Sequence, residues 1–385
     1  MILAIQSTTF GAYGGIPGYN RLICRALNEF PEAENGLVLV ATDNQSDIQA
    51  PTIELPRLRL RAFSQNRLAL TQSFFRLALR EQIDLILVGH VNYAPLAWFL
   101  KRIQPQLRYG VMLYGIEAWR PLSAVRRRAV QKADFFISIS EYTKQKAVES
   151  NALDSSRFHL LPNALEFAQT PPSPKEVVSS PRGLGTRLLS VCRLEQSERY
   201  KGVDKVIECL SELAKSVHDV QYTVVGGGTD LERHKALAER LGVESRVRFL
   251  GFISDEALGA CYRECDVFVM PSAGEGFGFV FLEAMKYGKP IVAARSGGAP
   301  EVVRDGVNGR LVEYGDRTEL LESLIDLSLN RNLRVKLGEG GYKHLQENYT
   351  FEAFKQKLAD IIRLELPAQS ARRFSPSHES QSCAS

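Results

Sequence analysis

Short apolar runs alternate with amphipathic stretches along most of this 385-residue chain. The runs in the first half lie at residues 3–6, 37–41, 85–88, 109–113 and 135–139, and those in the second half at 188–192, 222–225, 247–250, 267–270 and 290–294. Apolar runs of this length predict strands that are buried on both faces, as in parallel sheets. The stretches between them have helical spacing, for example 19–29, 66–81, 203–217 and 231–241. The pattern therefore predicts an α/β fold with two doubly wound, Rossmann-like domains.

The length of the chain also indicates two domains, because a single core rarely grows beyond about 250–300 residues. A Pro- and Ser-rich stretch without periodicity, residues 169–183, is typical of a linker. We expect an N-terminal domain at 1–168, a linker at 169–186 and a C-terminal domain at 187–350. A last helix is expected at 351–366, followed by a disordered polar tail at 367–385.

The charge of the chain is unevenly distributed. Its net charge is +4, but residues 51–134 contain fourteen Lys or Arg and five acidic residues, a local excess of +9. Such a field attracts anions, which include phosphorylated ligands, nucleic acids and anionic membranes. No nucleic-acid-binding motif or aromatic platform accompanies these arginines, which disfavours nucleic acid. Solvated arginines on ordinary helices explain the excess equally well.

The cysteines and the first residues of the chain indicate the cellular compartment of the protein. Six cysteines are scattered without paired C-x-x-C units, which is typical of reduced thiols in the cytoplasm. The first six residues have no basic segment and are too short for a signal peptide. Apolar runs also stay below the 18–20 residues of a membrane span. We therefore expect a soluble cytoplasmic protein that is at most peripheral to a membrane.

The segment 271–285 carries the most chemistry. Glycines at 274, 276 and 278 allow a close backbone approach to a ligand and expose N–H groups where a helix starts. Glu275 lies in this loop, and Glu283 follows eight residues later on the expected helix. By periodicity alone, a loop carboxylate and a solvated helix carboxylate are the more ordinary interpretation of these two residues.

The wider pattern resembles a known family. The spacing of Glu275 and Glu283 within Pro-Ser-x-x-Glu-Gly-Phe-Gly-x-x-x-Leu-Glu-Ala-Met is similar to the E-x7-E signature of retaining glycosyltransferases of the GT-B fold, closest to glycosyltransferase family 4. The resemblance continues through 288–293, 297–303 and 306–309. It covers the second half almost continuously, from about residue 188 to 315, and the first half in patches.

The resemblance implies roles for residues of the second half. Arg193 and Lys201 match the cations that clamp the donor diphosphate, and Arg199 is a neighbour of these two without an assigned role. Glu275 would contact the transferred sugar and Glu283 the ribose. The remaining donor-binding residues are Gly276, Phe277, Gly278, Phe279 and, at the turn expected to contact the base, Phe252. A packed loop aromatic is an equally ordinary interpretation of Phe252.

Three loops of the first half follow predicted strands. Gly14 and Gly15 resemble the glycine loop whose amides approach the diphosphate. Tyr114 stands where many family members have His, so proton transfer by this side chain is disfavoured near neutral pH. His90, Tyr114 and Glu117 are the expected acceptor or sugar contacts. A helix cap for His90 and an ordinary loop acid for Glu117 are the alternatives.

The resemblance therefore implies a retaining, metal-independent transferase that moves a hexosyl group from a UDP- or GDP-sugar to a saccharide or lipid-linked acceptor, in polysaccharide or glycolipid synthesis. No Asp-x-Asp pair is present to hold a metal, and no cofactor is expected. The basic first domain is expected to contact an anionic membrane surface, as in family members with lipid-linked acceptors. A sugar-nucleotide epimerase of the same fold, or a catalytically silent nucleotide-binding homologue, remains the alternative.

Overall fold

The computed structural model describes residues 1–31, 36–50, 54–165 and 186–367. The chain divides into two compact units. Unit 1 contains Met1–Ile139, Thr143–Leu161 and the chain from Phe354 onward, and unit 2 contains Ser140–Tyr142 and Pro162–Ala353. Most of the expected linker at 169–186 and of the tail at 367–385 lies outside the described residues.

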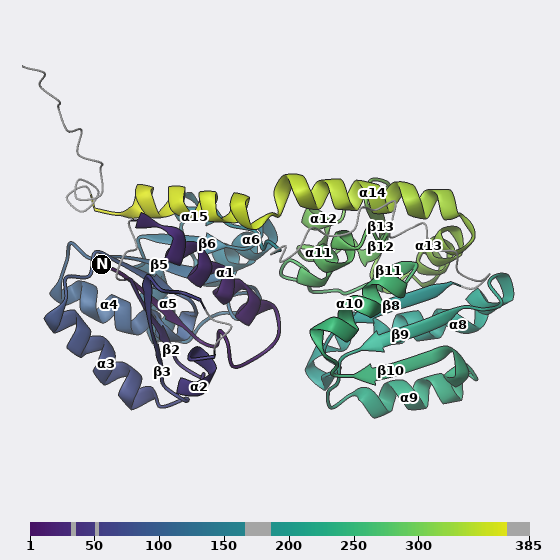
Figure 1. Ribbon diagram of the computed structural model, residues 1–385, viewed down its shortest axis with the longest axis horizontal. Helices are drawn as coiled ribbons and strands as arrows, with labels where there is room; N and C mark the ends of the chain where they lie inside the picture. Colours follow the sequence, from purple (N-terminus) through teal and green to yellow (C-terminus); the bar gives the residue numbers. More distant parts are fainter. Residues whose placement is uncertain (32–35, 51–53, 166–185, 368–385) are drawn as a thin grey trace, which may run out of the picture. The chain divides into compact units, whose positions relative to one another are not determined.

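Unit 1 is built on a parallel seven-stranded sheet in the order β3-β2-β1-β4-β5-β6-β7. The strands are β1 (Ile2–Gln6), β2 (Gly36–Val40), β3 (Leu58–Ala62), β4 (Leu85–Val88), β5 (Arg108–Leu113), β6 (Phe135–Ser138) and β7 (Phe158–Leu160). Helices flank both faces (Figure 1): α1 (Gly15–Glu29), α2 (Gln45–Ile48), α3 (Arg67–Arg80), α4 (Ala94–Ile103), α5 (Ala124–Gln131) and α6 (Glu141–Asn151). Alternate residues of the central strands pack against Leu70, Phe74 and Leu77 of α3 and Ala97 of α4.

Unit 2 repeats this architecture with six parallel strands in the order β10-β9-β8-β11-β12-β13. They are β8 (Arg187–Val191), β9 (Gln221–Val225), β10 (Val247–Gly251), β11 (Val267–Met270), β12 (Ile291–Ala294) and β13 (Gly309–Val312). The helices are α8 (Val203–Ser216), α9 (Leu231–Arg240), α10 (Asp255–Glu264), α11 (Phe279–Lys286), α12 (Ala299–Val302), α13 (Arg317–Leu329) and α14 (Arg331–Asn348), with a 3-10 segment η4 (Gln196–Lys201). The predicted fold of two doubly wound parallel sheets is confirmed.

The strands that the sequence pattern missed lie at sheet edges. In β3 the less exposed positions Leu58, Leu60 and Ala62 alternate with the exposed Arg59 and Arg61, because one face of this edge strand is turned toward solvent. The edge strand β7 has three residues, and the edge strand β13 opens with Gly309. None of these segments is the continuous apolar run that marks a central parallel strand.

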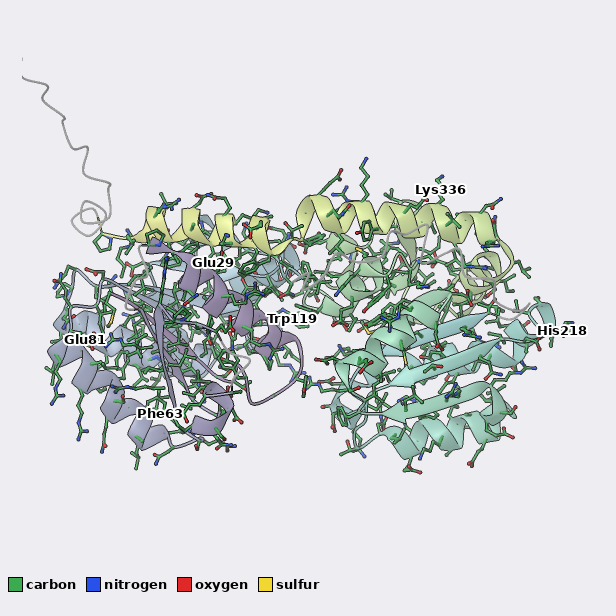
Figure 2. The ribbon with its side chains drawn as sticks, viewed as in Figure 1. Glu29, Phe63, Glu81, Trp119, His218 and Lys336 are labelled. Carbon is green, nitrogen blue, oxygen red and sulfur yellow. The ribbon has the colours of Figure 1, made fainter. Side chains whose placement is uncertain are left out.

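The last helix, α15 (Phe351–Glu365), belongs to unit 1 from Phe354 onward. The ring of Phe354 packs edge-on against Tyr19 of α1, with centroids 5.4 Å apart. Lys355 Nζ donates to Glu29 Oε2 at 2.6 Å, and Figure 2 labels Glu29 on α1 next to this helix. At the end of α15, the buried Glu365 carboxylate accepts from Arg108 and lies 2.8 Å from His159 Nε2. These contacts fix α15 to α1 and to the strands β5 and β7 of the first sheet.

Candidate functional site

Three of the charged residues singled out in unit 2, Arg193, Lys201 and Glu275, lie in loops that follow β8 and β11, which are neighbouring strands. The chain order reverses between these two strands, since β9 and β10 continue on one side and β12 and β13 on the other. In open parallel sheets, ligands bind at this switch point, beyond the carboxyl ends of the strands. The loop after β8 contains Arg193 and Lys201, and the loop after β11 contains Glu275.

Lys201 and Glu275 form an ion pair across these two loops. Lys201 Nζ donates to Glu275 Oε1 at 2.6 Å, and the two side chains are 18% and 10% exposed. Burial by itself lowers the pKa of Lys201, but the neighbouring Glu275 carboxylate outweighs it, so that this pKa lies above its ordinary value. The ammonium group is therefore a permanent cation at the edge of the site. The structure brings together two residues that are 74 positions apart.

A second ion pair lies in the same loop. Arg193 donates to Glu198 Oε1 and is 69% exposed, whereas the Glu198 side chain is 11% exposed. The hydroxyl of Tyr200 lies near both ion pairs. Burial raises the pKa of Tyr200, and the charges of both pairs also act on this pKa: Lys201, Glu198, Glu275 and Arg193. Two cations and two carboxylates thus gather around one half-buried tyrosine.

Glycines allow the loop of Glu275 to lie directly on its neighbour. A Cβ at Gly297 would be 2.5 Å from the carbonyl oxygen of Glu275, and a Cβ at Gly298 would be 2.4 Å from that of Gly276. The N–H of Gly298 donates to the Glu275 carbonyl at 2.7 Å. The Gly-Gly pair after β12 therefore sets the height of the Glu275 loop above the sheet.

The start of α11, in the same loop as Glu275, has no side-chain cap. Gly278 is its N-cap, with φ +93 and no side-chain cap. The first N–H groups of a helix without a cap are free to bind an anion or a sugar oxygen. Phe279 is the first residue of α11, and the Phe277 side chain is buried with its ring edge-on to Tyr349 at 5.6 Å. The Phe277 side chain is thus occupied by the core, and a ligand could meet only its main chain.

Glu283 lies in the second turn of α11 and has a partner that sequence reasoning missed. Tyr262 of α10 donates its hydroxyl to Glu283 Oε2 at 2.7 Å, and its ring stacks on Tyr287 with an interplanar angle of 6°. Burial raises the pKa of Glu283, and the hydrogen bond from Tyr262 offsets part of that rise. An aromatic residue in the helix before β11 gave no sign of this role, because the contact exists only once α10 and α11 pack together.

A third loop, residues 226–230 after β9, is joined to the loop after β8. Leu194 donates to the Gly227 carbonyl at 2.9 Å and accepts from the Asp230 N–H at 2.7 Å. Arg199 binds the buried Asp230 carboxylate with Nε and Nη2, at 3.1 Å and 2.7 Å from Oδ1. Arg199 therefore fixes the loop that carries the two cations.

Phe252 stands at the edge of this region on the turn after β10. Its side chain is 80% exposed, so the interpretation as a packed loop aromatic is wrong. The ring lies beside Gly227, where an added Cβ would be 3.0 Å from Cε2. An exposed ring next to a glycine turn offers a flat apolar face.

In unit 1, the loop after β1 is organised by a buried carboxylate. Asp43 accepts hydrogen bonds from Thr8 Oγ1 at 2.8 Å and from the N–H groups of Thr9, Phe10 and Gly11. This loop leads to Gly14, the uncapped N-cap of α1 with φ +126. Apart from their chain neighbours and their own helix, no atom of the described residues lies within 4 Å of a Cβ built at Gly14 or Gly15, so this helix start is open.

The side chain of Tyr114 points into the core. It is 6% exposed, and its hydroxyl donates to Asn20 Oδ1 at 2.8 Å. A ligand would have to displace Asn20 to reach this hydroxyl. Glu117 Oε1 accepts from the N–H of Gly115 at 3.1 Å and from that of Tyr114, so it shapes the loop in which it lies.

His90 caps the short helix that follows it. Its Nδ1 accepts from the Asn92 N–H at 3.2 Å, which leaves the proton of the neutral ring on Nε2. Burial and the nearby Arg126 lower the pKa of His90, so the ring is neutral near pH 7. The helix-cap interpretation thus describes its observed contact.

Among the residues that the structure describes, no three or more His, Cys, Asp or Glu side chains form a cluster suited to a metal ion.

The arrangement resembles several solved structures. HepE from Anabaena, crystallised with UDP, superposes with a TM-score of 0.74 at 21% identity, over 94% of this chain and 99% of that one. Sucrose-phosphate synthase from Thermosynechococcus elongatus gives 0.74 at 20% identity, over 94% of this chain and 98% of that one. Likeness at this level defines the class by its fold, which is GT-B.

Sequence comparison identifies the family within that class. Residues 14–164 match the family model "Glycosyl transferase 4-like domain", and residues 185–344 match "Glycosyl transferases group 1". The chain belongs to the group 1 glycosyltransferases, glycosyltransferase family 4, and the resemblance seen in the sequence is confirmed.

Two relatives represent the similarity. The GDP-mannose-dependent alpha-(1-6)-phosphatidylinositol monomannoside mannosyltransferase of Mycolicibacterium smegmatis is 33% identical over 63% of this chain and 66% of its own length. The D-inositol 3-phosphate glycosyltransferase of Corynebacterium jeikeium is 31% identical over 63% of this chain and 59% of its own length. The chain thus matches less than two thirds of the length of these relatives.

Proposed function

We propose that this chain is a retaining, metal-independent hexosyltransferase that uses a nucleoside-diphosphate sugar and a saccharide or lipid-linked acceptor. The observation that carries the proposal is the ion pair of Lys201 and Glu275, held within 2.6 Å at the switch point of the second sheet. The pair places a permanent cation beside a carboxylate. A nucleotide sugar needs both groups, because its diphosphate binds a cation and its sugar hydroxyls donate hydrogen bonds to a carboxylate.

The chemistry follows from where charge develops. When the bond between the anomeric carbon and the diphosphate breaks, negative charge builds on the leaving phosphate and positive charge on the sugar. In our proposal, Lys201 and Arg193 stabilise the departing diphosphate, together with the N–H groups of Gly278 and Phe279 at the open start of α11. Glu275 accepts hydrogen bonds from sugar hydroxyls, and Glu283 accepts them from the ribose.

The nucleotide is UDP or GDP. HepE was crystallised with UDP, and the mannosyltransferase relatives are named as GDP-mannose-dependent. The exposed ring of Phe252 beside Gly227 provides a stacking surface for either base. The mannosyltransferases named above favour GDP-mannose as the first donor to test.

The surface of helices α3 and α4 in unit 1, to which we assign the acceptor, supports the proposal of a membrane contact. Helices α3 and α4 carry exposed apolar side chains, Leu68 (77%), Leu79 (87%), Phe99 (53%) and Ile103 (62%). Exposed arginines flank them on the same two helices: Arg67, Arg76, Arg80 and Arg102. Phe75 of α3 and Phe99 of α4 are in ring contact at 5.6 Å, so the two helices form one surface. Apolar side chains surrounded by arginines suit the interface of an anionic bilayer. No described helix is long and apolar enough to cross a membrane.

The test is donor turnover. The purified chain is incubated with GDP-mannose, UDP-glucose and related donors, with and without lipid acceptor, in the presence of EDTA, and release of the nucleoside diphosphate is measured. We expect turnover that persists in EDTA and falls at least about 100-fold in Lys201→Ala and Glu275→Ala. Lys235→Ala is the control, because Lys235 forms an exposed pair with Glu232 on α9. NMR of the product gives the anomeric configuration, and an inverted product would contradict retention.

Other outcomes separate the alternatives. Nucleotide binding without turnover on any donor or acceptor would indicate a silent homologue. Conversion of one nucleotide sugar into its epimer would indicate an epimerase. Turnover that EDTA abolishes and Mg²⁺ restores would contradict metal independence.

A further inference from the structure

Each cation assigned to the diphosphate already has a carboxylate partner, but the two pairs differ. In the Lys201–Glu275 pair, Glu275 has its own proposed role toward the sugar. In the Arg193–Glu198 pair, Glu198 has no role in the proposed chemistry. Its presence beside a diphosphate-binding arginine therefore needs a separate explanation.

Glu198 is held in place by its surroundings. Its side chain is 11% exposed, whereas the Arg193 side chain is 69% exposed and borders solvent. Glu198 is also the residue whose φ of −117 interrupts η4, and its N–H donates to the Glu195 carbonyl at 2.8 Å. A buried carboxylate on a fixed loop cannot follow Arg193 toward a ligand.

The second carboxylate oxygen of Glu198 is unsatisfied. In the part of the chain that the structure describes, Oε2 is buried and has no hydrogen-bond partner, so Arg193 supplies the hydrogen bond made by the other oxygen. If Arg193 turned to a diphosphate, Glu198 would lose that partner while remaining buried near a new anion. Leaving a buried charge without its partner is costly.

We propose that Glu198 weakens the binding of the nucleoside diphosphate by competing with it for Arg193. This inference rests on the proposed function and adds a residue that sets product affinity. The carboxylate opposes the capture of Arg193 by the diphosphate, because Arg193 must leave Glu198 to reach that ligand. Its effect is to favour release of the nucleoside diphosphate after transfer.

The experiment is calorimetric binding of GDP and UDP to the full chain and to Glu198→Gln. The amide has the shape of the carboxylate but not its charge, so we expect Kd to fall by roughly three- to tenfold. A gain in affinity cannot come from misfolding. Glu232→Gln is the matched control, because it removes one charge from the same unit at an exposed pair with Lys235.

A double-mutant cycle tests the route through Arg193. In an Arg193→Ala background, Glu198→Gln should change Kd by less than about twofold. An unchanged or weaker affinity in Glu198→Gln would overturn the proposal, and so would a full gain that persists without Arg193. If the unmodified chain binds neither nucleotide, the proposed function fails first; if it binds and Glu198→Gln is neutral, only this inference fails.

Discussion

At the scale of single residues, the site depends on charged groups whose positions are fixed by partners. Asp230 holds Arg199, Tyr262 holds Glu283, and Glu275 holds Lys201, with donor-to-acceptor distances of 2.6–2.7 Å. The E-x7-E spacing is enough to indicate Glu275 and Glu283. It cannot indicate Tyr262 or Asp230, because their roles depend on contacts between elements far apart in the chain.

Tyr262→Phe tests how much the position of Glu283 matters. Loss of the hydroxyl leaves a buried carboxylate without this hydrogen bond, and we expect the donor Kd to rise about five- to thirtyfold. Tyr222→Phe is the control, since it removes a buried hydroxyl that lies 2.6 Å from Ser190 in the same unit. Both variants should lose similar stability in urea, and only Tyr262→Phe should lose donor affinity. Equal affinities in the two variants would contradict a positioning role for Tyr262.

At the scale of elements, glycines allow the loops above the second sheet to pack backbone against backbone. Gly226 approaches the Cys192 carbonyl, Gly202 that of Pro271, and Gly297 that of Glu275. The sequence indicates that glycines after strands shape the backbone near a ligand. It does not indicate which loop each glycine contacts, because that depends on strand order in the sheet.

Gly297→Ala tests this packing. The new Cβ would lie 2.5 Å from the Glu275 carbonyl oxygen, at a φ of +64, so the Glu275 loop must move. We expect donor affinity to fall at least about tenfold and the free energy of unfolding by roughly 2–4 kcal/mol.

Gly315→Ala is the control for backbone strain alone, since Gly315 has φ +86 and open space around it. It should lose about 1 kcal/mol and no affinity. If both variants bind the donor as the unmodified chain does, the close approach is not needed for binding.

At the scale of the whole molecule, the excess of positive charge is separate from the donor site. Arg193 and Lys201 lie in unit 2, whereas residues 51–134, with their local excess of +9, lie in unit 1. The donor cations are neutralised by internal carboxylates, but Arg126, Arg127 and Arg128 of α5 are all exposed. The two sets of cations therefore serve different ligands in our proposal.

Replacing Arg126, Arg127 and Arg128 with Ala tests the membrane contact. We expect weaker co-sedimentation with phosphatidylglycerol vesicles at low salt, by about 1 kcal/mol for each arginine close to the surface. Phosphatidylcholine vesicles, to which neither protein should bind, are the control. A second triple variant, Arg76, Arg80 and Arg102 to Ala, tests the surface of α3 and α4. Its turnover of a soluble acceptor should stay unchanged. Binding that is insensitive to both variants and to salt would contradict the membrane proposal.

The fold class, the two repeated sheets and the loops to which we assign the donor site in our proposal can all be predicted from the sequence, because buried parallel strands and glycine-rich turns leave local patterns. Which side chains meet could not be predicted in this way and follows from the folded arrangement. Tyr114 turns inward to Asn20, His90 caps a helix, and Glu198 holds Arg193. The physical reason is that local sequence sets the conformation of each element, whereas the partner of a side chain is set by strand order and packing across the sheet.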